Sequence, residues 1–513
     1  MSNLYIGDVL SIERFDSIDS WRGLYTLGII SNPIWLTVSS QQNRAADIAL
    51  SFIREIAIKS TQLKRSDQRI RVGIIGAGVG GMTLAYCLHS FRIPNQKFSL
   101  SVDVFEKHSG ICPIQRGSHT RRLHPTLQYW PDASRHPYYY IKQLASTPTH
   151  SALRWTGGIT AGDLASKISK EYFENFGFYA KSGRKNILSV YEGCGYLLVK
   201  KSESGYYDIT LQGHKIIDSL GNSEPISRII ENYDAIFFAT GFGVERAFEK
   251  NGVHHESTPY WRNDSLGQFN LNDEPHRYLI SGNGDGAVSD VLRAIIVDYK
   301  PDELLSAIFG AQVSELISKS FNISKKHTNS TLENLQICLR HFIGVDLLQT
   351  AKSHDVLSEL HKMWNISKQH KPPYVGVWKH ADSPLKMISK VLVWPRIKKN
   401  VEVIVHLKDS AELGEIINNP AVTFYNRFLF YVVWAAGKIT LKTGDLLDVA
   451  KRHQIKPSSM IIRHGADSRA PIRGVLSEDL YSAFERRKSA KITLKDISLA
   501  KDLENYRKGL RVT

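Results

Sequence analysis

Three glycines with a fixed spacing, Gly76, Gly78 and Gly81, lie between an apolar run and a helical pattern. The apolar run predicts a short buried strand at residues 72–75, and the pattern predicts a helix beginning near residue 82. In such an arrangement the first glycine permits a tight turn, the second lets a pyrophosphate reach the main chain, and the third lets helix and strand pack closely. The unpaired N–H groups that start the helix would bind phosphate. The spacing therefore predicts a dinucleotide-binding turn, and the alternative is an ordinary glycine-rich connection.

A carboxylate ends the next predicted strand. Residues 98–106 alternate between apolar and polar, then become apolar, and Glu106 is the last of them. A carboxylate at this strand end accepts hydrogen bonds from the ribose hydroxyls of a bound adenosine and repels a 2′-phosphate. The separation from Gly81 is slightly long, which a loop insertion at residues 93–97 explains. We expect Glu106 to bind ribose, unless it is only a solvated carboxylate at a strand end.

A loop at residues 116–131 has the most unusual composition of the chain, because cations and aromatic rings are dense in it. Arg121 and Arg122 could neutralise a pyrophosphate or a substrate carboxylate. His124 and Tyr129 could line a flavin or an aromatic substrate. Alternatively, the loop is a scaffold that its prolines stiffen, and its arginines are solvated. No catalytic base can be named from these residues.

The length of 513 residues is enough for two to four domains with a large core. The formal net charge is +16, and the residues from 367 onward carry 27 Lys and Arg against 14 Asp and Glu, a net charge of +13. This basic region could engage nucleic acid, an anionic membrane or another polyanion. The alternative is a basic solvated surface, because the charges are interleaved with apolar residues.

The four cysteines are far apart in the sequence and show no C-x-x-C pairing. This spacing argues against a zinc site and against a disulfide framework. The sequence opens without a recognisable secretory signal, and the densest apolar run, residues 428–436, is too short to cross a bilayer. We therefore expect a cytoplasmic protein without a membrane span and without a bound metal.

Further elements follow from hydrophobic periodicity. Before the glycine turn we expect a strand at 34–39 and an amphipathic helix at 45–56. Short strands at 196–200, 206–211 and 215–218 predict a β-meander. The next apolar strand ends in Ala239-Thr240-Gly241, and a later strand ends in Gly284-Asp285-Gly286 before a helix. Residues 301–368 read as helical, followed by expected strands at 374–378, 388–393 and 401–407 and by a helix at 424–437.

The triplet Arg463-His464-Gly465 follows an apolar pair and resembles the phosphohistidine triplet of phosphoglycerate-mutase-like enzymes. In those enzymes the triplet opens its own α/β domain from a first strand. Only about fifty residues follow it here, so we expect a structural or surface role.

The order of the motifs resembles the FAD domain of the glutathione-reductase-type superfamily of flavoproteins, which have two dinucleotide folds and include amine oxidases and flavin monooxygenases. The likeness covers residues 70–300. It implies that Asp285 lies at the ribityl and pyrophosphate end of FAD, with Thr240 and Gly241 near the other side of the cofactor. It specifies no reaction, because this fold hosts many chemistries.

Two departures from the resemblance are visible in the sequence. No second well-formed G-x-G-x-x-G stands in a strand–helix setting, whereas enzymes that bind NADPH in a separate domain usually show one. No cysteine pair lies near the first turn, which argues against disulfide-reductase chemistry.

We therefore expect an α/β protein with a Rossmann-like FAD-binding domain, a β-meander, a helical insertion and an α+β C-terminal region. The expected divisions are an N-terminal α/β extension at 1–69, the FAD domain at 70–300, a helical region at 301–368 and the basic region at 369–513. The residues expected to bind the cofactor are Gly76, Gly78, Gly80, Gly81, Glu106, Lys107, Arg122, Thr240, Gly241, Asp285 and Gly286. Those expected to bind substrate are Arg121, His124 and Tyr129.

Two function classes follow. The first is an FAD-dependent oxidoreductase, an oxidase or monooxygenase, acting on a small anionic or aromatic substrate. The second is a non-catalytic sensor or interaction protein that binds FAD or NAD and whose basic C-terminal region engages a protein partner or a polyanion. A homo-oligomer is compatible with both classes, and a nucleic-acid-directed enzyme is a weaker third reading.

Overall fold

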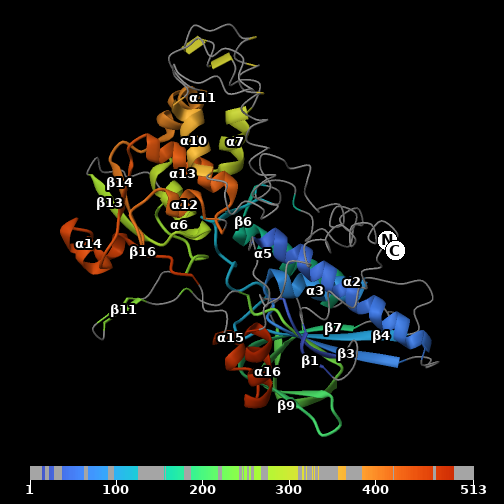
Figure 1. Ribbon diagram of the computed structural model, residues 1–513. Coiled ribbons are helices and arrows are strands. Elements are labelled where there is room, and N and C mark those ends of the chain that lie inside the picture. The colour runs from blue at the N-terminus through green and yellow to red at the C-terminus, as the bar shows by residue number, and fades with distance from the viewer. Residues whose placement is uncertain are drawn as a thin grey trace. The chain divides into compact units, whose positions relative to one another are not determined.

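The computed structural model divides the chain into two compact units (Figure 1). Unit 1 contains residues 1–125, 137–244 and 466–513, and unit 2 contains residues 126–136 and 245–465. The predicted boundary after residue 300 falls inside unit 2, and the predicted N-terminal extension falls inside unit 1. The structure describes residues 14–17, 22–27, 37–62, 68–90, 98–124, 127, 155, 158–177, 187–217, 222–241, 245, 248–250, 253–255, 259–266, 275–309, 315–316, 319–320, 326, 329, 333, 356–365, 384–419, 421–465 and 470–489.

Unit 1 is built on an 8-stranded sheet with the order β1-β2-β10-β3-β4-β7-β8-β9. The strands from β2 to β7 in this order are parallel, whereas β1 and the meander β7-β8-β9 pair in the antiparallel sense. The elements of this unit are β1 (Arg14–Ser17), β2 (Gly23–Thr26), α2 (Val38–Gln62), β3 (Gln68–Ile75), α3 (Val79–Ser90), β4 (Phe98–Phe105), β5 (Arg122–Leu123), β6 (Ile159–Thr160), α5 (Ala161–Glu171), η4 (Tyr172–Gly177), β7 (Ile187–Lys201), β8 (Tyr207–Ile216), β9 (Ser223–Tyr233), β10 (Ala235–Phe238), α15 (Ala470–Arg473) and α16 (Glu478–Ser489).

Helices cover both faces of this sheet, because its central strands are apolar on both sides. In β10, Phe237 packs against α2 and α3, whereas its neighbours Ile236 and Phe238 pack into the cluster that contains residues of α15 and α16. Figure 1 shows α2, α3 and α5 on one face and α15 and α16 on the other. Near-continuous apolar strands are typical of parallel sheets that are buried on both faces. The rings of Tyr25 and Phe237 stack at 4.8 Å and join β2 to β10.

Unit 2 contains a second parallel sheet, with the order β15-β14-β13-β16. One face packs on α6, α7, α10 and α13, and the other packs on α14. The elements of this unit are β11 (Phe248–Lys250), β12 (Val253–His255), β13 (His276–Ser281), α6 (Asp285–Ile295), α7 (Pro301–Phe309), α10 (Val356–Asn365), α11 (Pro384–Ile388), η5 (Ser389–Val393), η6 (Trp394–Arg396), β14 (Val401–His406), α12 (Gly414–Ile417), α13 (Phe424–Ala435), β15 (Ile439–Lys442), α14 (Leu446–Arg452), η7 (Pro457–Ser459) and β16 (Met460–Ile462).

The coarse prediction of an α/β fold with parallel strands in the Rossmann manner is confirmed by both sheets. Three local predictions were wrong. The expected strand at 388–393 is helical in α11 and η5, Ser39 lies in α2 rather than in a strand, and residues 215–216 end β8 rather than forming a third strand. Short apolar runs do not distinguish a strand from a buried helix. The expected strand at 374–378 lies outside the described residues.

Candidate functional site

The glycine turn of unit 1 joins β3 to α3 at the carboxyl edge of the parallel strands. The main-chain N–H of Gly76 donates to the carbonyl of Phe105 at 2.7 Å, and that of Ala239 donates to the carbonyl of Ile75 at 2.8 Å. The ends of β4, β3 and β10 are therefore bonded side by side. The order of strands reverses between β3 and β10, and ligands of open α/β sheets bind in the crevice at such a point.

Each glycine of this turn has a distinct steric environment. Gly76 has a φ of +107°, and a Cβ there would lie 2.5 Å from the carbonyl oxygen of Ala239. A Cβ on Gly81 would collide with the carbonyl oxygen of Gly76. A Cβ on Gly78 would meet nothing within 4 Å, and one on Gly80 would meet only side chains, the nearest being Leu27 at 3.5 Å. The first and third glycines are thus needed for packing, and the second leaves the space that a pyrophosphate would fill.

Glu106 follows β4 and is bonded to the turn. Its Oε2 accepts a hydrogen bond from the N–H of Ala77 at 2.8 Å, and its Oε1 accepts one from the N–H of His108 at 2.9 Å. The side chain is nearly buried, whereas the neighbouring Lys107 is exposed. Each carboxylate oxygen has a second lone pair, so these bonds leave acceptor capacity for ribose hydroxyls. The carboxylate therefore stabilises the turn, and its binding of ribose stays a prediction.

The segment after Glu106 folds back over the turn, which the sequence did not reveal. The N–H of Cys112 donates to the carbonyl of Ala77 at 2.9 Å, and the N–H groups of Gln115 and Arg116 both approach the carbonyl of Cys112. Cys112 adopts a φ of +52° and is fully buried. Burial raises the pKa of its thiol well above the ordinary value, so the thiol stays protonated. A single sequence does not indicate that a non-glycine residue such as Cys112 adopts a left-handed backbone conformation.

The cationic loop lies in unit 1 as far as residue 124. Arg121 is buried, and its carbonyl accepts a bond from the N–H of Ala161 at the start of α5. Arg122 is half-buried in β5 and donates from Nη2 to the carbonyl of Gly158 at 3.3 Å. His124 is half-buried. Tyr129 lies outside the described residues. The loop therefore has a structural role in anchoring α5, and its predicted ligand contacts stay predictions.

Thr240 and Gly241 follow β10 at the same edge as the glycine turn. Thr240 is half-buried, and Gly241 is exposed with a φ of +71°. The structure thus brings the ends of β3, β4 and β10, each with its predicted motif, to one edge of one sheet.

Asp285 and Gly286 belong to unit 2. Asp285 begins α6, and its Oδ1 accepts bonds from the N–H and Oγ1 of Thr423 at 2.8 and 2.7 Å and from Nδ2 of Asn426 at 2.9 Å. It therefore ties α6 to the start of α13. Gly286 lies against the ring of Tyr260, 3.4 Å from where its Cβ would be.

Unit 2 repeats the backbone geometry of the first turn. The N–H of Gly282 donates to the carbonyl of His406 at 3.0 Å, and the N–H of Arg463 donates to the carbonyl of Ser281 at 2.7 Å. Gly282 has a φ of +135°, and a Cβ there would collide with the carbonyl oxygen of Arg463. A Cβ on Gly284 would meet nothing within 4 Å. These contacts match, in order, those of Gly76 and Gly78 in unit 1.

The sequence did contain this second turn. Gly282, Gly284 and Ala287 follow the G-x-G-x-x-A form of the dinucleotide pattern, and Ala287 is buried where the helix packs on the strand. The prediction concerned G-x-G-x-x-G, which this segment does not contain, so it missed a turn that has alanine at the third position. The resemblance to an FAD domain had placed residues 284–286 in the same domain as the first turn.

The two turns differ at the strand-end carboxylate. The residue after β14 that corresponds to Glu106 is Leu407, which is buried, and the next residue is the exposed Lys408. The carboxylate that repels a 2′-phosphate is therefore absent from this position in unit 2.

A chain of polar side chains connects three strand ends of unit 2. Nε2 of His406 lies 2.8 Å from the carbonyl of Gly444, to which it donates, so its Nδ1 accepts from the hydroxyl of Ser281 at 2.9 Å. The Ser281 oxygen then accepts from Nε2 of His464 at 2.7 Å. These donor roles follow from the network rather than from observed hydrogens. Burial and the neighbouring His406 lower the pKa of His464.

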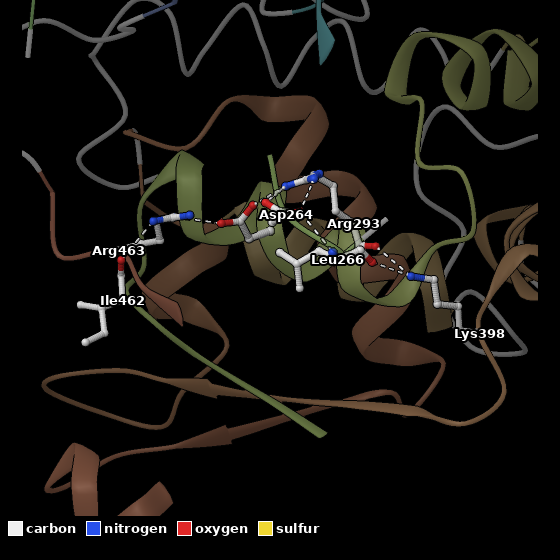
Figure 2. Close-up of polar contacts among 7 residues, drawn as sticks. Asp264, Leu266, Arg293, Lys398, Ile462 and Arg463 are labelled. Carbon is white, nitrogen blue, oxygen red and sulfur yellow. Dashed lines mark hydrogen bonds and ion pairs between the residues drawn. The ribbon is translucent and has the colours of Figure 1, made fainter. Parts of the chain in front are cut away.

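A buried ionic network lies beside this edge (Figure 2). Nε of Arg463 lies 2.9 Å from Asp290, and Arg293 contacts Asp290 at 3.0 Å and Asp264 at 2.6 Å. Lys398 donates to the carbonyls of Leu266 and Arg293. The network fixes the segment 259–266 and the end of β16 against α6, so Arg463 of the triplet is structural.

The described residues contain no group of three or more metal-ligating side chains. In the same described part of the chain, none of the helices combines the length and apolar character needed to cross a membrane.

No protein-family model matches the chain, and no curated protein matches its sequence. Among solved structures, the chain is similar to a polycyclic ketone monooxygenase from the thermophilic fungus Thermothelomyces thermophila, with a TM-score of 0.22 and 12% sequence identity. The similarity covers 50% of this chain and 42% of that monooxygenase, so the chain spans less than half of its length. At this TM-score the likeness establishes neither a shared fold nor a shared activity.

Proposed function

We propose that unit 1 binds FAD and that the protein is an FAD-dependent oxidoreductase acting on a small anionic or aromatic substrate. The observation that carries the proposal is the open space over Gly78, framed by two glycines that main-chain atoms crowd and by Glu106. These residues fit the adenosine and pyrophosphate of a dinucleotide. Bound FAD would supply the electron-transfer chemistry.

The chain's own residues have defined tasks in this proposal. The N–H groups that begin α3 face the phosphates, as the first turn of a helix offers unpaired donors. Glu106 accepts ribose hydroxyls while it holds Ala77 in place. Arg121 and Arg122 contribute positive charge from the segment that leads into α5.

The second turn offers a binding site for a molecule that would donate electrons to the flavin. We propose that the turn at Gly282 and Gly284 in unit 2 binds a nicotinamide dinucleotide, NADH or NADPH, as hydride donor. Its backbone repeats the geometry of the first turn, and Leu407 in place of a carboxylate makes the site compatible with a 2′-phosphate. The alternative function, a sensor that binds a dinucleotide without turnover, requires binding at the first turn but no reduction of the flavin.

The visible spectrum of the purified full-length chain tests the proposal. A flavin absorbance, present on purification or after reconstitution with FAD, should bleach on addition of NADH or NADPH. A flavin that binds but does not bleach, with either nucleotide or with candidate substrates, supports the sensor. A chain that binds no FAD overturns both the enzyme and the assignment of the turn.

Matched alanine variants locate the two sites. Gly78→Ala should abolish FAD binding without unfolding the chain, because the added methyl group meets no protein atom. Gly195→Ala is the control, since its Cβ also meets nothing within 4 Å and it lies on β7. Gly284→Ala should leave FAD bound and slow its reduction by the nicotinamide dinucleotide.

A further inference from the structure

The triplet Arg463-His464-Gly465 follows β16 at the carboxyl edge of the sheet in unit 2. In the order β15-β14-β13-β16, the next two strands of the chain lie on one side of β13 and the last lies on the other. The order therefore reverses between β13 and β16, and ligands of open α/β sheets bind in the crevice at such a point. The sequence predicts only a structural or surface role for the triplet, but its place in the sheet is one where a ligand would bind.

The main chain of the triplet packs directly on the second turn. The N–H of Arg463 donates to the carbonyl of Ser281 at 2.7 Å. A Cβ on Gly282 would collide with the carbonyl oxygen of Arg463, which belongs to the peptide group that joins Arg463 to His464. The main chain of His464 therefore begins at the turn itself.

A hydrogen bond fixes the imidazole of His464 at the same edge. Its Nε2 lies 2.7 Å from Oγ of Ser281, the residue immediately before Gly282. Ser281 is buried, whereas His464 is exposed. The guanidinium of Arg463 instead bonds through Nε to the buried Asp290 (Figure 2). Of the two basic side chains in the triplet, His464 is therefore the one that a ligand at the turn can reach.

The hydrogen bonds of this edge decide which imidazole accepts a further proton. With both imidazoles neutral, His406 donates to the carbonyl of Gly444 and accepts from Ser281, which accepts in turn from His464. A proton added to His406 would go to Nδ1 and force the Ser281 hydroxyl to reverse. A proton added to His464 goes to Nδ1 and leaves these three bonds as they are. The network therefore directs protonation to the exposed imidazole.

The surroundings of His464 favour its neutral form in the chain without ligand. Burial and the neighbouring His406 lower the pKa of His464, so the imidazole is largely uncharged at neutral pH. Asp285 is bonded to the start of α13 and Asp445 caps α14. Other charged residues that end or follow these strands are Lys408, Lys442 and Arg463. The pyrophosphate of a dinucleotide would bring negative charge to the turn, and an anion within about 4–6 Å favours the protonated imidazole.

We infer that His464 binds the dinucleotide of unit 2 as an imidazolium and takes up a proton from the solution when the phosphates of the ligand occupy the turn. Ser281 is a positioning residue, because it holds the imidazole at the crevice. The inference rests on the proposed binding of NADH or NADPH at Gly282 and Gly284. It adds a dependence on pH, because affinity should be severalfold higher at about pH 6 than at about pH 8.

Titration calorimetry on the full chain tests the inference, with NAD⁺ and NADP⁺ as probes because the oxidised dinucleotides do not reduce a bound flavin. Heats measured at about pH 7.5 in two buffers of different ionisation enthalpy give the protons taken up with each ligand. The unaltered chain should take up protons. His464→Gln should bind severalfold more weakly and take up fewer, because the amide keeps a donor for Ser281 but does not titrate. Protons that the ligand itself exchanges cancel in the difference between the two proteins.

His453→Gln is the control, because His453 follows α14 at the opposite end of that helix from its first turn. Its proton uptake should equal that of the unaltered chain. Binding without proton uptake by the unaltered chain overturns the inference and leaves the proposed function standing, and so does equal uptake by the unaltered chain and His464→Gln. Equal losses in both histidine variants also overturn the inference, because they show a general effect on unit 2. An unaltered chain that binds neither NAD⁺ nor NADP⁺ overturns both the inference and the proposed nicotinamide site.

Discussion

The carboxylate of Glu106 accepts a hydrogen bond from the main-chain N–H of Ala77 over 2.8 Å, so the end of β4 and the glycine turn form one bonded structure. The same carboxylate accepts a second bond from the N–H of His108. The glycine turn and the carboxylate at the end of β4, which lie about thirty residues apart in the sequence, are therefore joined by this side chain. The shape of the turn and the position of the ribose acceptor depend on one side chain.

Glu106→Gln should lower both stability and dinucleotide affinity. The amide can accept a bond with its oxygen but presents an NH₂ group to the other N–H, which leaves one buried donor unpaired. We expect a loss of about 1–3 kcal/mol in the free energy of unfolding, measured with urea, and a weaker binding of FAD. Glu174→Gln is the control, since the ion pair between Glu174 and Lys170 is exposed and its loss is expected to cost about 0–1 kcal/mol. Equal stability of the two variants would contradict this role of Glu106.

Gly282→Ala should destabilise the protein, whereas Gly284→Ala should not. At Gly282 the φ of +135° and the approach of the Arg463 carbonyl oxygen both oppose a side chain. We expect a loss of about 1–3 kcal/mol or more in the free energy of unfolding. At Gly284 an added methyl group meets no atom within 4 Å, so stability should change by less than about 0.5 kcal/mol. Denaturation with urea measures both, and a reversed order would refute the proposed similarity of the two turns.

Asp290→Asn should be strongly destabilising. Asp290 is fully buried between Arg463 and Arg293, so the substitution removes the negative charge that both guanidinium groups contact (Figure 2). Removing one partner of a buried ion pair costs about 3–5 kcal/mol. Glu402→Gln is the control, because Glu402 and Arg277 form an exposed pair whose loss should cost about 0–1 kcal/mol. Calorimetric or urea unfolding of the two variants checks the difference, and similar values for both would show that the network contributes little.

Lys398 should make stability depend on pH at alkaline values. Burial, together with the charge of Arg293, lowers the pKa of Lys398 from 10.5 to about 8 in the folded chain. Between about pH 8 and pH 10 the unfolded chain therefore holds more protons than the folded chain, and the free energy of unfolding contributed by this group rises with pH. Below that window both states are protonated and the penalty for burying the charge is fully present.

The variant Lys398→Met isolates this effect from other groups that titrate in the same range. The free energy of unfolding should be measured at about pH 7.5 and about pH 9.5 for both proteins. The unaltered chain should gain stability relative to Lys398→Met as the pH rises. A constant difference between the two proteins would show that the pKa of Lys398 is not lowered in the folded state.

Local patterns were predicted well because their residues are close in the sequence. The strand before Gly76, the helix after Gly81 and the carboxylate after β4 depend on short-range periodicity and turn chemistry, and the structure has all three. The run at 388–393 was predicted incorrectly, because a short apolar stretch suits a strand and a buried helix equally.

The choice of neighbouring strands could not be predicted in the same way. The apolar residues of β2 and β13 do not indicate which strand each of them pairs with. Each strand pairs with segments far away in the sequence. Thus Asp285 was expected at the ribityl and pyrophosphate end of FAD within one domain at residues 70–300, and the strand before it joins β14 and β16 in unit 2. Residues 1–69 were expected to form an N-terminal α/β extension, and the strand β2 of this segment, which was not predicted, pairs inside the first sheet.

The sequence by itself determined the kind of turn at Gly76, Gly78 and Gly81 and the acidic group that serves it, because steric demands on a few neighbouring residues decide both. Only the tertiary structure decided that the glycine turns at residues 76–81 and 282–287 belong to two separate sheets and that α2 begins beside the first one. Strand pairing is a long-range choice, made by burial and hydrogen bonding across the whole sheet. Patterns of single segments do not contain that information.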